Sequence, residues 1–182
     1  QAEGAYNVDG KSLTIPEVMQ FNAKNDRKVT KQLKITREMI EEAKNDPDTV
    51  KYPKRRGIDF YHSYKEDLAL FAEMGFKVLR ISIAWTRLYP TGEELQANPE
   101  GIEFYKNVLK EMKDLGIEAL ITLSHYEMPI ELALKYNGWT DRRVIDMFVR
   151  FCKTCFEEFG EYAKLWLNFN EVDSIIRHPF TT

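Results

Sequence analysis

Apolar and polar positions follow two alternating patterns from about residue 58 to the end of the chain. Three segments carry apolar side chains at helical spacing, and each is closed by a glycine, so they predict helices over 60–75, 98–116 and about 140–160. Three short runs of apolar and β-branched residues predict strands over 77–84, 117–124 and 164–170. Strands that alternate with helices favour right-handed crossovers, and therefore a parallel sheet of the α/β class.

Particular residues mark where these helices begin and end. Asn98 is a typical N-cap, Pro99 follows it at the first helical position, and Gly116 lies just past the end. The next helix begins at Thr140 or Asp141. Each strand begins about 40 to 47 residues after the one before, a spacing that suits a (β/α) barrel with long loops.

The stretch 17–57 differs from the rest of the chain. It is rich in charge, poor in large apolar side chains, and interrupted by Pro47 and Pro53. A short helix is expected from about Thr36 to Lys44. The remainder is expected to be a long polar loop, which is either functional or partly disordered.

Composition and charge remove several classes of function. With 182 residues, 43% of them hydrophobic, and a net charge of −3, the chain has a globular composition unlike that of a nucleic-acid binder. The basic cluster at 51–57 lies between acidic segments and is interpreted as a solvated loop. No apolar run is long enough for a membrane span, and the N-terminus has no signal-peptide pattern. The first residue is Gln, which indicates either processing or a chain that does not start where its gene starts.

Two cysteines, Cys152 and Cys155, form a C-x-x-C pattern inside the third predicted helix. A redox-active pair usually opens a helix, so these residues are interpreted as half-buried thiols of a reducing compartment. A cytoplasmic location is therefore expected.

Candidate chemistry gathers where the strands end, because the loops after parallel strands converge at one edge of the sheet. Polar and aromatic residues stand inside or just beyond all three strands: Arg80, Trp85 and Arg87 for the first, Ser124, His125, Tyr126 and Glu127 for the second, and Asn170 and Glu171 for the third. Arg80 interrupts an apolar strand and is expected to meet a carboxylate, either in a structural ion pair or in a functional site. For His125, structural capping of the strand end is an equal alternative.

Glu171 is the strongest catalytic candidate by position. A carboxyl group at the end of an apolar strand, near aromatic residues such as Trp85 and Tyr126, has its ionised form disfavoured by desolvation. This property suits a general acid that works near neutral pH. Aromatic rings beside hydrogen-bonding side chains are typical of sugar-binding sites.

Four motifs, in order, resemble glycoside hydrolase family 1, the retaining β-glycosidases. They are "QAEG" from Gln1, "RISIAWTRLYP", "TLSHYEMP" followed by "NGW" at 137–139, and "LNFNEVD". The resemblance covers essentially the whole chain. "SHYEMP" and residues 59–77 are most similar to the bacterial 6-phospho-β-glucosidase branch, so the implied substrate is a β-glucoside or 6-phospho-β-glucoside.

The resemblance also implies a fold and a role for each candidate. Residues 1–182 would be the N-terminal part of a single (β/α)8 TIM barrel domain, roughly its first half without the first strand, and 17–57 would be the loop after that missing strand. The implied roles are general acid/base for Glu171, a contact to the sugar 2-hydroxyl for Asn170, contacts to other hydroxyls for Gln1 and His125, orientation of the nucleophile for Arg80, and aromatic contacts at the mouth of the site for Tyr126 and Trp85. No metal or organic cofactor, nucleic acid or membrane is implied.

The nucleophile of the family, a Glu in a T-E-N-G motif, does not occur in this sequence. The chain by itself is therefore expected to be inactive. Glu127 is the other acid near a strand end, and an inverting pair needs carboxyls about 6.5 to 9.5 Å apart, but the family gives that residue no such role. Two alternatives are a truncated barrel whose exposed sheet edges bind a second copy or a completing C-terminal half, and an incomplete record of a full-length enzyme.

Overall fold

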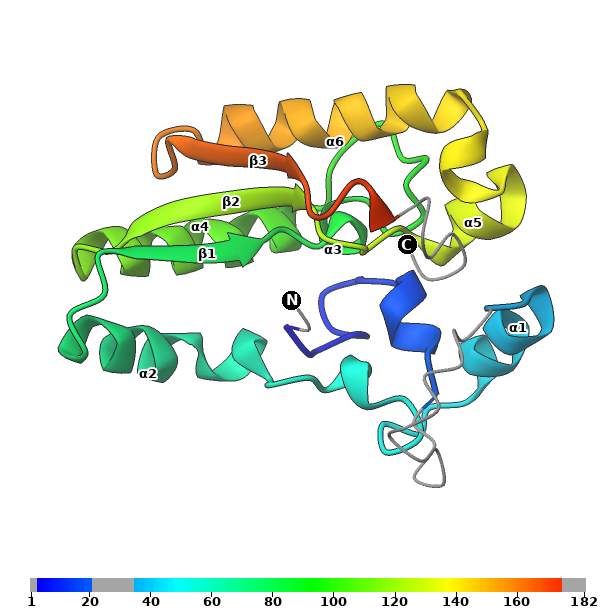
Figure 1. Ribbon diagram of the computed structural model, residues 1–182, viewed down its shortest axis with the longest axis horizontal. Helices are drawn as coiled ribbons and strands as arrows, with labels where there is room; N and C mark the ends of the chain where they lie inside the picture. The colour runs from blue at the N-terminus through cyan, green and yellow to red at the C-terminus, as the bar shows by residue number, and fades with distance from the viewer. Residues whose placement is uncertain (1–2, 21–34, 175–182) are drawn as a thin grey trace.

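The computed structural model describes residues 3–20 and 35–174, and its centre is a sheet of three parallel strands (Figure 1). The strands lie in the order β1-β2-β3, with Arg80 opposite Leu120 and Leu120 opposite Leu165. Their bounds are Val78–Ser82 for β1, Glu118–Ser124 for β2 and Leu165–Phe169 for β3. The predicted parallel sheet is therefore confirmed.

Three long helices accompany the strands, as their apolar spacing predicts. They are α2 (Phe60–Glu73), α4 (Pro99–Asp114) and α6 (Arg143–Phe159). Asn98 caps α4, since its side chain accepts the backbone N–H of Glu100 at 3.2 Å. The start of α6 lies slightly later than expected, at Arg143, whose N–H donates to the Asp141 carboxylate at 2.9 Å.

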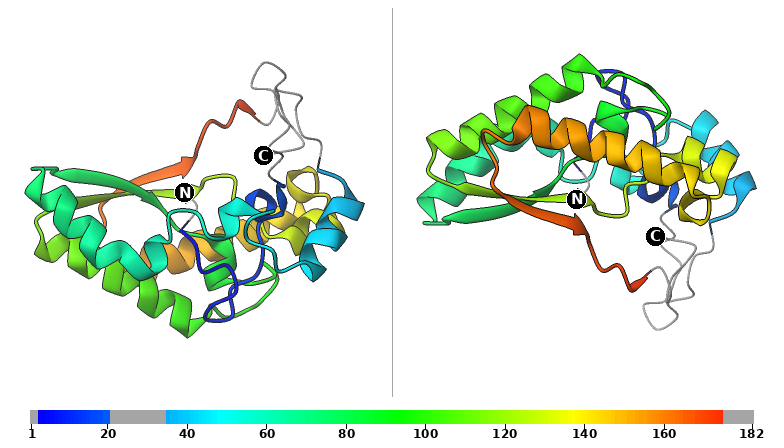
Figure 2. Two further views of the ribbon diagram at one scale, coloured as in Figure 1. Left: turned by 90° about the horizontal axis from the view of Figure 1, so that it is seen from below. Right: turned by 90° about the horizontal axis from the view of Figure 1, so that it is seen from above.

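Helices α4 and α6 lie on one face of the sheet and bury it (Figure 2). Strand residues that point towards them are excluded from water: Ile81 is 5% exposed and Ile121 is fully buried. The helices contribute fully buried side chains to the same core, among them Val108, Met112, Phe151 and Phe159. Burial on this scale is the main source of stability for the three-stranded unit.

The opposite face of the sheet is open. Val78, Leu165 and Leu167 point to this face and are 44%, 40% and 39% exposed. Successive side chains of a strand point to opposite faces, so these strands carry hydrophobic side chains on both faces of the sheet. Strands with two apolar faces are typical of sheets that are covered on both sides. The open apolar face is consistent with part of a barrel, whose interior would bury it.

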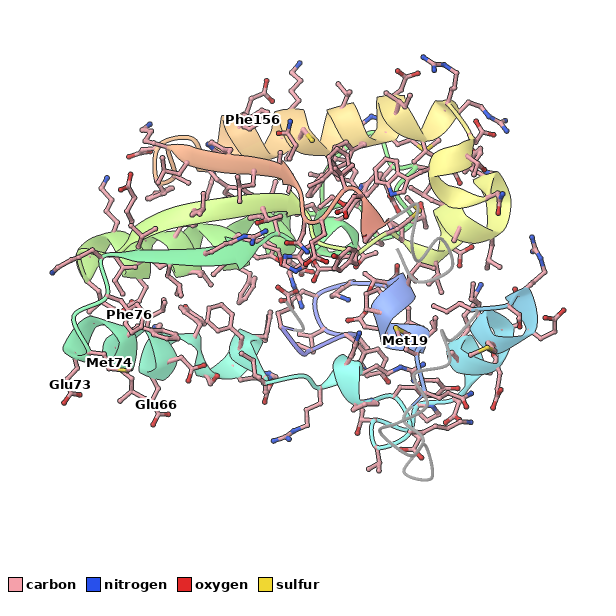
Figure 3. All side chains as sticks on the ribbon, viewed as in Figure 1. Met19, Glu66, Glu73, Met74, Phe76 and Phe156 are labelled. Carbon is pink, nitrogen blue, oxygen red and sulfur yellow. The ribbon has the colours of Figure 1, made fainter. Side chains whose placement is uncertain are left out.

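Further apolar side chains are exposed at the end of the molecule away from the carboxyl ends of the strands. Figure 3 labels Met74 and Phe76 there, at the end of α2, and these residues are 71% and 43% exposed. Phe156 on α6 is 46% exposed. None of the helices in 3–20 and 35–174 is long and apolar enough to cross a bilayer.

Short helical elements follow the strands and connect the longer helices. They are α3 (Trp85–Leu88), α5 (Ile130–Tyr136) and η3 (Gly138–Thr140), and the hydrophobic pattern did not predict them because each has two turns or fewer. The first follows β1 directly, and the other two lie between β2 and α6. They shape the chain at the carboxyl ends of the strands.

The N-terminal region contains η1 (Ile15–Val18), α1 (Arg37–Asn45) and η2 (Pro53–Arg55). The short helix expected near Thr36 is confirmed, and the Thr36 hydroxyl caps it by accepting the N–H of Met39 at 3.3 Å. The solvated-loop interpretation of 51–57 is wrong at Arg55, which is 1% exposed. Its guanidinium donates to backbone carbonyls of Glu17, Ala43 and Asp46, so it satisfies the groups that the end of α1 leaves without partners.

Candidate functional site

The loop formed by residues 3–18 packs against the carboxyl ends of the strands. An antiparallel bridge joins Thr14 to Pro129, just after β2. On either side of it, the N–H of Ile15 donates to Met128 at 3.0 Å and that of Ile130 donates to Leu13 at 3.2 Å. This contact brings the N-terminal loop beside His125 and its neighbours.

One hydrogen-bonded chain connects polar residues from all three strands. Arg80 on β1 donates from Nη2 to Asn170 Oδ1 at 2.9 Å. Asn170, next to the end of β3, donates from Nδ2 to the Tyr126 hydroxyl at 2.9 Å. Tyr126, which follows β2, donates to Glu171 Oε2 at 2.5 Å. The sequence placed Arg80 inside a strand and the other three at strand ends, and the structure joins the four through successive hydrogen bonds.

The backbone is unusual at two of these residues. Tyr126 has φ of 70° and Glu171 has φ of 43°, both in the left-handed region. For residues with a Cβ this region is sparsely populated, and such conformations are found preferentially at functional sites. The turn at each strand end therefore aims the two side chains towards each other.

Arg80 differs from its prediction in one respect. It is exposed on the open face of the sheet, where Nε donates to Thr122 Oγ1 at 2.7 Å. Over the described residues it makes no ion pair with a carboxylate, so the expected carboxylate partner is not found there. The hydroxyl and the amide instead fix the orientation of the guanidinium.

A cavity of about 200 Å³ lies between the N-terminal loop and the end of β2. His125, Tyr126 and Glu127 line one side, and Glu3 and Glu17 line another. Burial raises the pKa of Glu127, and the negative charge of Glu3 adds to the effect. The acid that sequence reasoning considered as a second catalytic carboxylate thus faces a buried group of charges.

His125 is partly buried and its ring packs edge-on against Tyr126, with centroids 5.4 Å apart. Burial lowers the pKa of His125 to about 4, and the positive charge of Arg80 acts in the same direction. The imidazole is therefore neutral at pH 7, with one ring nitrogen to donate and one to accept. This is the state that suits hydrogen bonds to a neutral hydroxyl.

A pH dependence of stability follows from His125. Because its pKa falls from 6.5 to about 4 on folding, the unfolded chain binds more protons between these values. The contribution to stability is complete above pH 6.5 and is lost as the pH falls towards 4. We expect His125→Gln to flatten the melting-temperature profile across this interval. Equal flattening in His62→Gln, a change of the exposed histidine on α2, would contradict the assignment to His125.

Trp85 lies in a different place from its predicted one. It is 3% exposed and stacks on Phe151 of α6, with centroids 5.6 Å apart, while Trp139 and Phe148 pack around it. The single turn of α3 directs the ring back into the core between the sheet and α6. Among the described residues, Trp85 thus belongs to an aromatic core cluster and not to the mouth of a site.

Arg87 was among the strand-end candidates, but its partner Glu3 was missed from the sequence. Arg87 is fully buried and its Nε donates to Glu3 Oε1 at 2.6 Å, while the Tyr105 hydroxyl donates to the other oxygen of Glu3 at 2.6 Å. The sequence signal for this ion pair was an arginine just after a buried strand together with the acidic Glu3 in the N-terminal "QAEG" motif. Gly4 follows that acid with φ of 82°, and a Cβ there would come within 2.6 Å of the Arg56 carbonyl oxygen.

The cysteines agree with the structural interpretation. Both lie within α6 and are free thiols. Burial raises the pKa of Cys152 to about 11 and also raises that of Cys155. A thiol with a raised pKa is a poor nucleophile at neutral pH. Gln1, the remaining predicted site residue, lies outside the described residues.

Comparison with known proteins finds the family that the sequence motifs resemble, and the match extends over the entire chain. The model of "Glycosyl hydrolase family 1" matches residues 1–182. A 6-phospho-beta-glucosidase of Clostridium longisporum is 44% identical over 180 residues, covering 99% of this chain and 34% of the relative. The 6-phospho-beta-glucosidase AscB of Escherichia coli is 41% identical over 181 residues, covering 100% of this chain and 36% of the relative. The chain thus spans about a third of the length of the curated relatives that it matches.

A solved structure shows the same architecture. A rice Os3BGlu6 beta-glucosidase in a covalent complex superposes with a TM-score of 0.76 at 33% sequence identity, covering 95% of this chain and 31% of the rice protein. The expected fold class, a partial (β/α)8 barrel, is thereby confirmed. The chain belongs to glycosyl hydrolase family 1.

Proposed function

We propose that residues 1–182 are the acid/base-bearing part of a retaining β-glycosidase that hydrolyses 6-phospho-β-glucosides. The observation that carries the proposal is the placement of Glu171 at the carboxyl end of β3, hydrogen-bonded through Tyr126 and Asn170 to Arg80. Family membership and the two phospho-β-glucosidase relatives support the reaction class.

In the proposed mechanism Glu171 acts twice. It first protonates the leaving glycosidic oxygen while a second carboxylate, from outside this chain, attacks the anomeric carbon. The ionised Glu171 then takes a proton from water, which releases the sugar with retained configuration. Glu171 is exposed on the open side of the sheet, so the desolvation expected from the sequence is not found within the described residues. A substrate and a second carboxylate have access to it there.

Arg80 is proposed to orient the nucleophile. Its Nε and one Nη2 proton are used on Thr122 and Asn170, and Nη1 makes no hydrogen bond within the described part of the chain. A guanidinium fixed on one side and free on the other is suited to hold a carboxylate. The proposed partner is the nucleophile of the complete barrel.

The sugar hydroxyls are proposed to contact Gln1, His125 and Asn170. The neutral ring of His125 lines the cavity beside the chain of hydrogen bonds. Tyr126 is the aromatic residue at the mouth, whereas the burial of Trp85 limits it to supporting the site from the core. Because phosphorylated sugars are retained inside cells, a cytoplasmic location fits this substrate class.

The open apolar face of the sheet supports a further part of the proposal, which is that this segment works only when it is covered. A completing C-terminal half is the favoured cover, and a second copy of the chain is the alternative. Strand edges and exposed apolar faces associate readily, since burying them removes hydrophobic surface from water.

One assay tests both substrate and completeness. The complete barrel enzyme is expected to hydrolyse an aryl 6-phospho-β-glucoside with kcat/KM at least about 100-fold above that for the unphosphorylated glucoside, since a charged contact is lost with the phosphate. The 182-residue chain alone is expected to show no turnover, because it lacks the nucleophile.

Adding the separately produced remainder of the barrel to the chain should restore activity and produce a larger species in size-exclusion chromatography. Turnover by the chain alone would contradict the two-carboxylate mechanism. Equal rates on both glucosides would remove the phosphorylated substrate from the proposal.

A further inference from the structure

We infer that Tyr126 is a positioning residue for Glu171, whose hydroxyl holds one carboxylate oxygen so that the other faces the leaving group. The inference rests on the proposed acid/base role of Glu171 and adds a residue to it. Tyr126 was otherwise expected to contact the sugar as an aromatic ring. The contacts of its hydroxyl indicate another purpose.

The donor and the acceptor are fixed in each hydrogen bond from Arg80 through Asn170 and Tyr126 to Glu171. A guanidinium has no acceptor atom, so Arg80 can only donate to Asn170 Oδ1. That contact turns the amide so that Nδ2 points at the Tyr126 oxygen, 2.9 Å away. With its oxygen accepting from Asn170, the phenol directs its own proton to Glu171 Oε2.

The final contact, between Tyr126 and Glu171, is short. At 2.5 Å it lies in the range of hydrogen bonds from a hydroxyl to a carboxylate. Burial and this hydrogen bond raise the pKa of Tyr126, so the phenol keeps its proton at neutral pH. Glu171 Oε1 has no hydrogen-bond partner among the described residues, which leaves it for proton transfer.

Neighbouring groups keep the Tyr126 ring in this position. Its edge-on contact with His125 fixes the plane of the ring. The left-handed backbone of Tyr126 and Glu171 turns both side chains towards the gap between β2 and β3. At the Arg80 end of this series of hydrogen bonds, the hydroxyl of the fully buried Thr122 accepts from Arg80 and holds it in place. The hydroxyl is therefore supplied from a fixed framework and requires no rearrangement to reach Glu171.

The test is Tyr126→Phe in the complete barrel enzyme, with the pH dependence of kcat/KM as the readout. A hydrogen bond donated to a carboxylate favours its ionised form, so removing this bond is expected to move the alkaline limb of the profile, where activity falls at high pH, upward. We also expect kcat to fall more than KM changes. A sugar contact alone would raise KM and leave the limb in place, and that result would overturn the inference.

Tyr136→Phe is the matched control, because the hydroxyl of Tyr136, the last residue of α5, donates to the carboxylate of Glu93 in a pair of the same kind. It should leave the pH profile unchanged, and an equal shift in this variant would overturn the inference. Glu171→Gln distinguishes failure of the acid/base role of Glu171 from failure of the positioning role of Tyr126. If Glu171→Gln retains activity, the acid/base assignment fails; if it is inactive but Tyr126→Phe leaves the limb in place, only the role of Tyr126 fails.

A second variant covers the case in which Tyr126→Phe does not fold. Thr122→Val removes the hydroxyl that accepts from Arg80, so Arg80 is held less firmly in its hydrogen bond to Asn170. The alkaline limb should move in the same direction by a smaller amount. A folded Thr122→Val enzyme with the profile of the parent would also overturn the inference.

Discussion

Replacing Glu171 by Gln in the complete barrel enzyme is expected to lower kcat/KM for substrates with poor leaving groups by about 1,000-fold, the usual contribution of a general acid. Gln has nearly the shape of Glu and can still accept the hydroxyl hydrogen bond of Tyr126 through its amide oxygen. It has no proton to transfer, so the loss reports chemistry and not packing.

The size of this loss should depend on the leaving group. An activated aryl leaving group departs without protonation, so the first step is nearly preserved and the second step, which needs a base, becomes limiting. In Glu171→Ala, azide is expected to restore turnover, because it attacks the glycosyl intermediate without a general base. Steady-state and burst kinetics on a series of aryl glycosides measure both effects.

Asp173→Asn is the matched control, since it makes the same carboxylate-to-amide change at an exposed position two residues further on. It is expected to leave kcat/KM within about twofold of the parent, as surface substitutions usually do. Equal losses in the two variants, or a Glu171→Gln enzyme with normal activity on poor leaving groups, would contradict the acid/base assignment.

Replacing Glu3 by Gln is expected to destabilise the folded chain by about 3–5 kcal/mol, the usual cost of removing one partner from a buried ion pair. The side chains of Arg87 and Glu3 are 0% and 7% exposed, and their charged atoms are 2.6 Å apart. The Gln amide oxygen could still accept from Arg87, but the positive charge would stay buried with only a neutral amide and backbone carbonyls near its nitrogens.

The surroundings of Arg87 explain why this cost has no easy relief. The guanidinium lies over the rings of Tyr61 and Phe104, 4.6 and 5.1 Å from their centroids, so it cannot turn towards water. Burial by itself would lower the pKa of Arg87, but the charge and hydrogen bond of Glu3, together with Tyr105 and Tyr61, outweigh burial and raise the pKa. Arg87 therefore remains charged, and the loss of Glu3 leaves that charge uncompensated.

Urea unfolding followed by circular dichroism measures this change in the free energy of unfolding. Glu131→Gln is the control, since Glu131 pairs with Lys44 at 2.9 Å but both side chains are about one-third exposed, at 36% and 35%. An exposed pair of this kind contributes about 1 kcal/mol or less. Similar losses in the two variants would show that burial does not determine the effect.

Much of the fold was predictable because it depends on local spacing. Residues three or four positions apart share a helix face, and β-branched runs fit a buried strand, so α2, α4, α6 and all three strands were found. The short elements α3, α5 and η3 were missed because one or two turns give no period to read. Arg55 was misinterpreted because its charge indicated solvent, while the structure uses the charge to satisfy backbone carbonyls at the end of α1.

The sequence by itself determined the order of the strands and long helices, the parallel sheet, and the identity of the residues that follow each strand. Only the tertiary structure decided which of those residues meet. Arg80 and Asn170 lie 90 positions apart, and Arg87 and Glu3 lie 84 apart, so their contacts depend on the sheet register and on how the N-terminal loop packs. The same packing turned Trp85 into the core and directed Tyr126 towards Glu171. Spacing along the chain decides which residues share a face of an element, whereas contacts between elements are decided by the shapes and charges that must pack together.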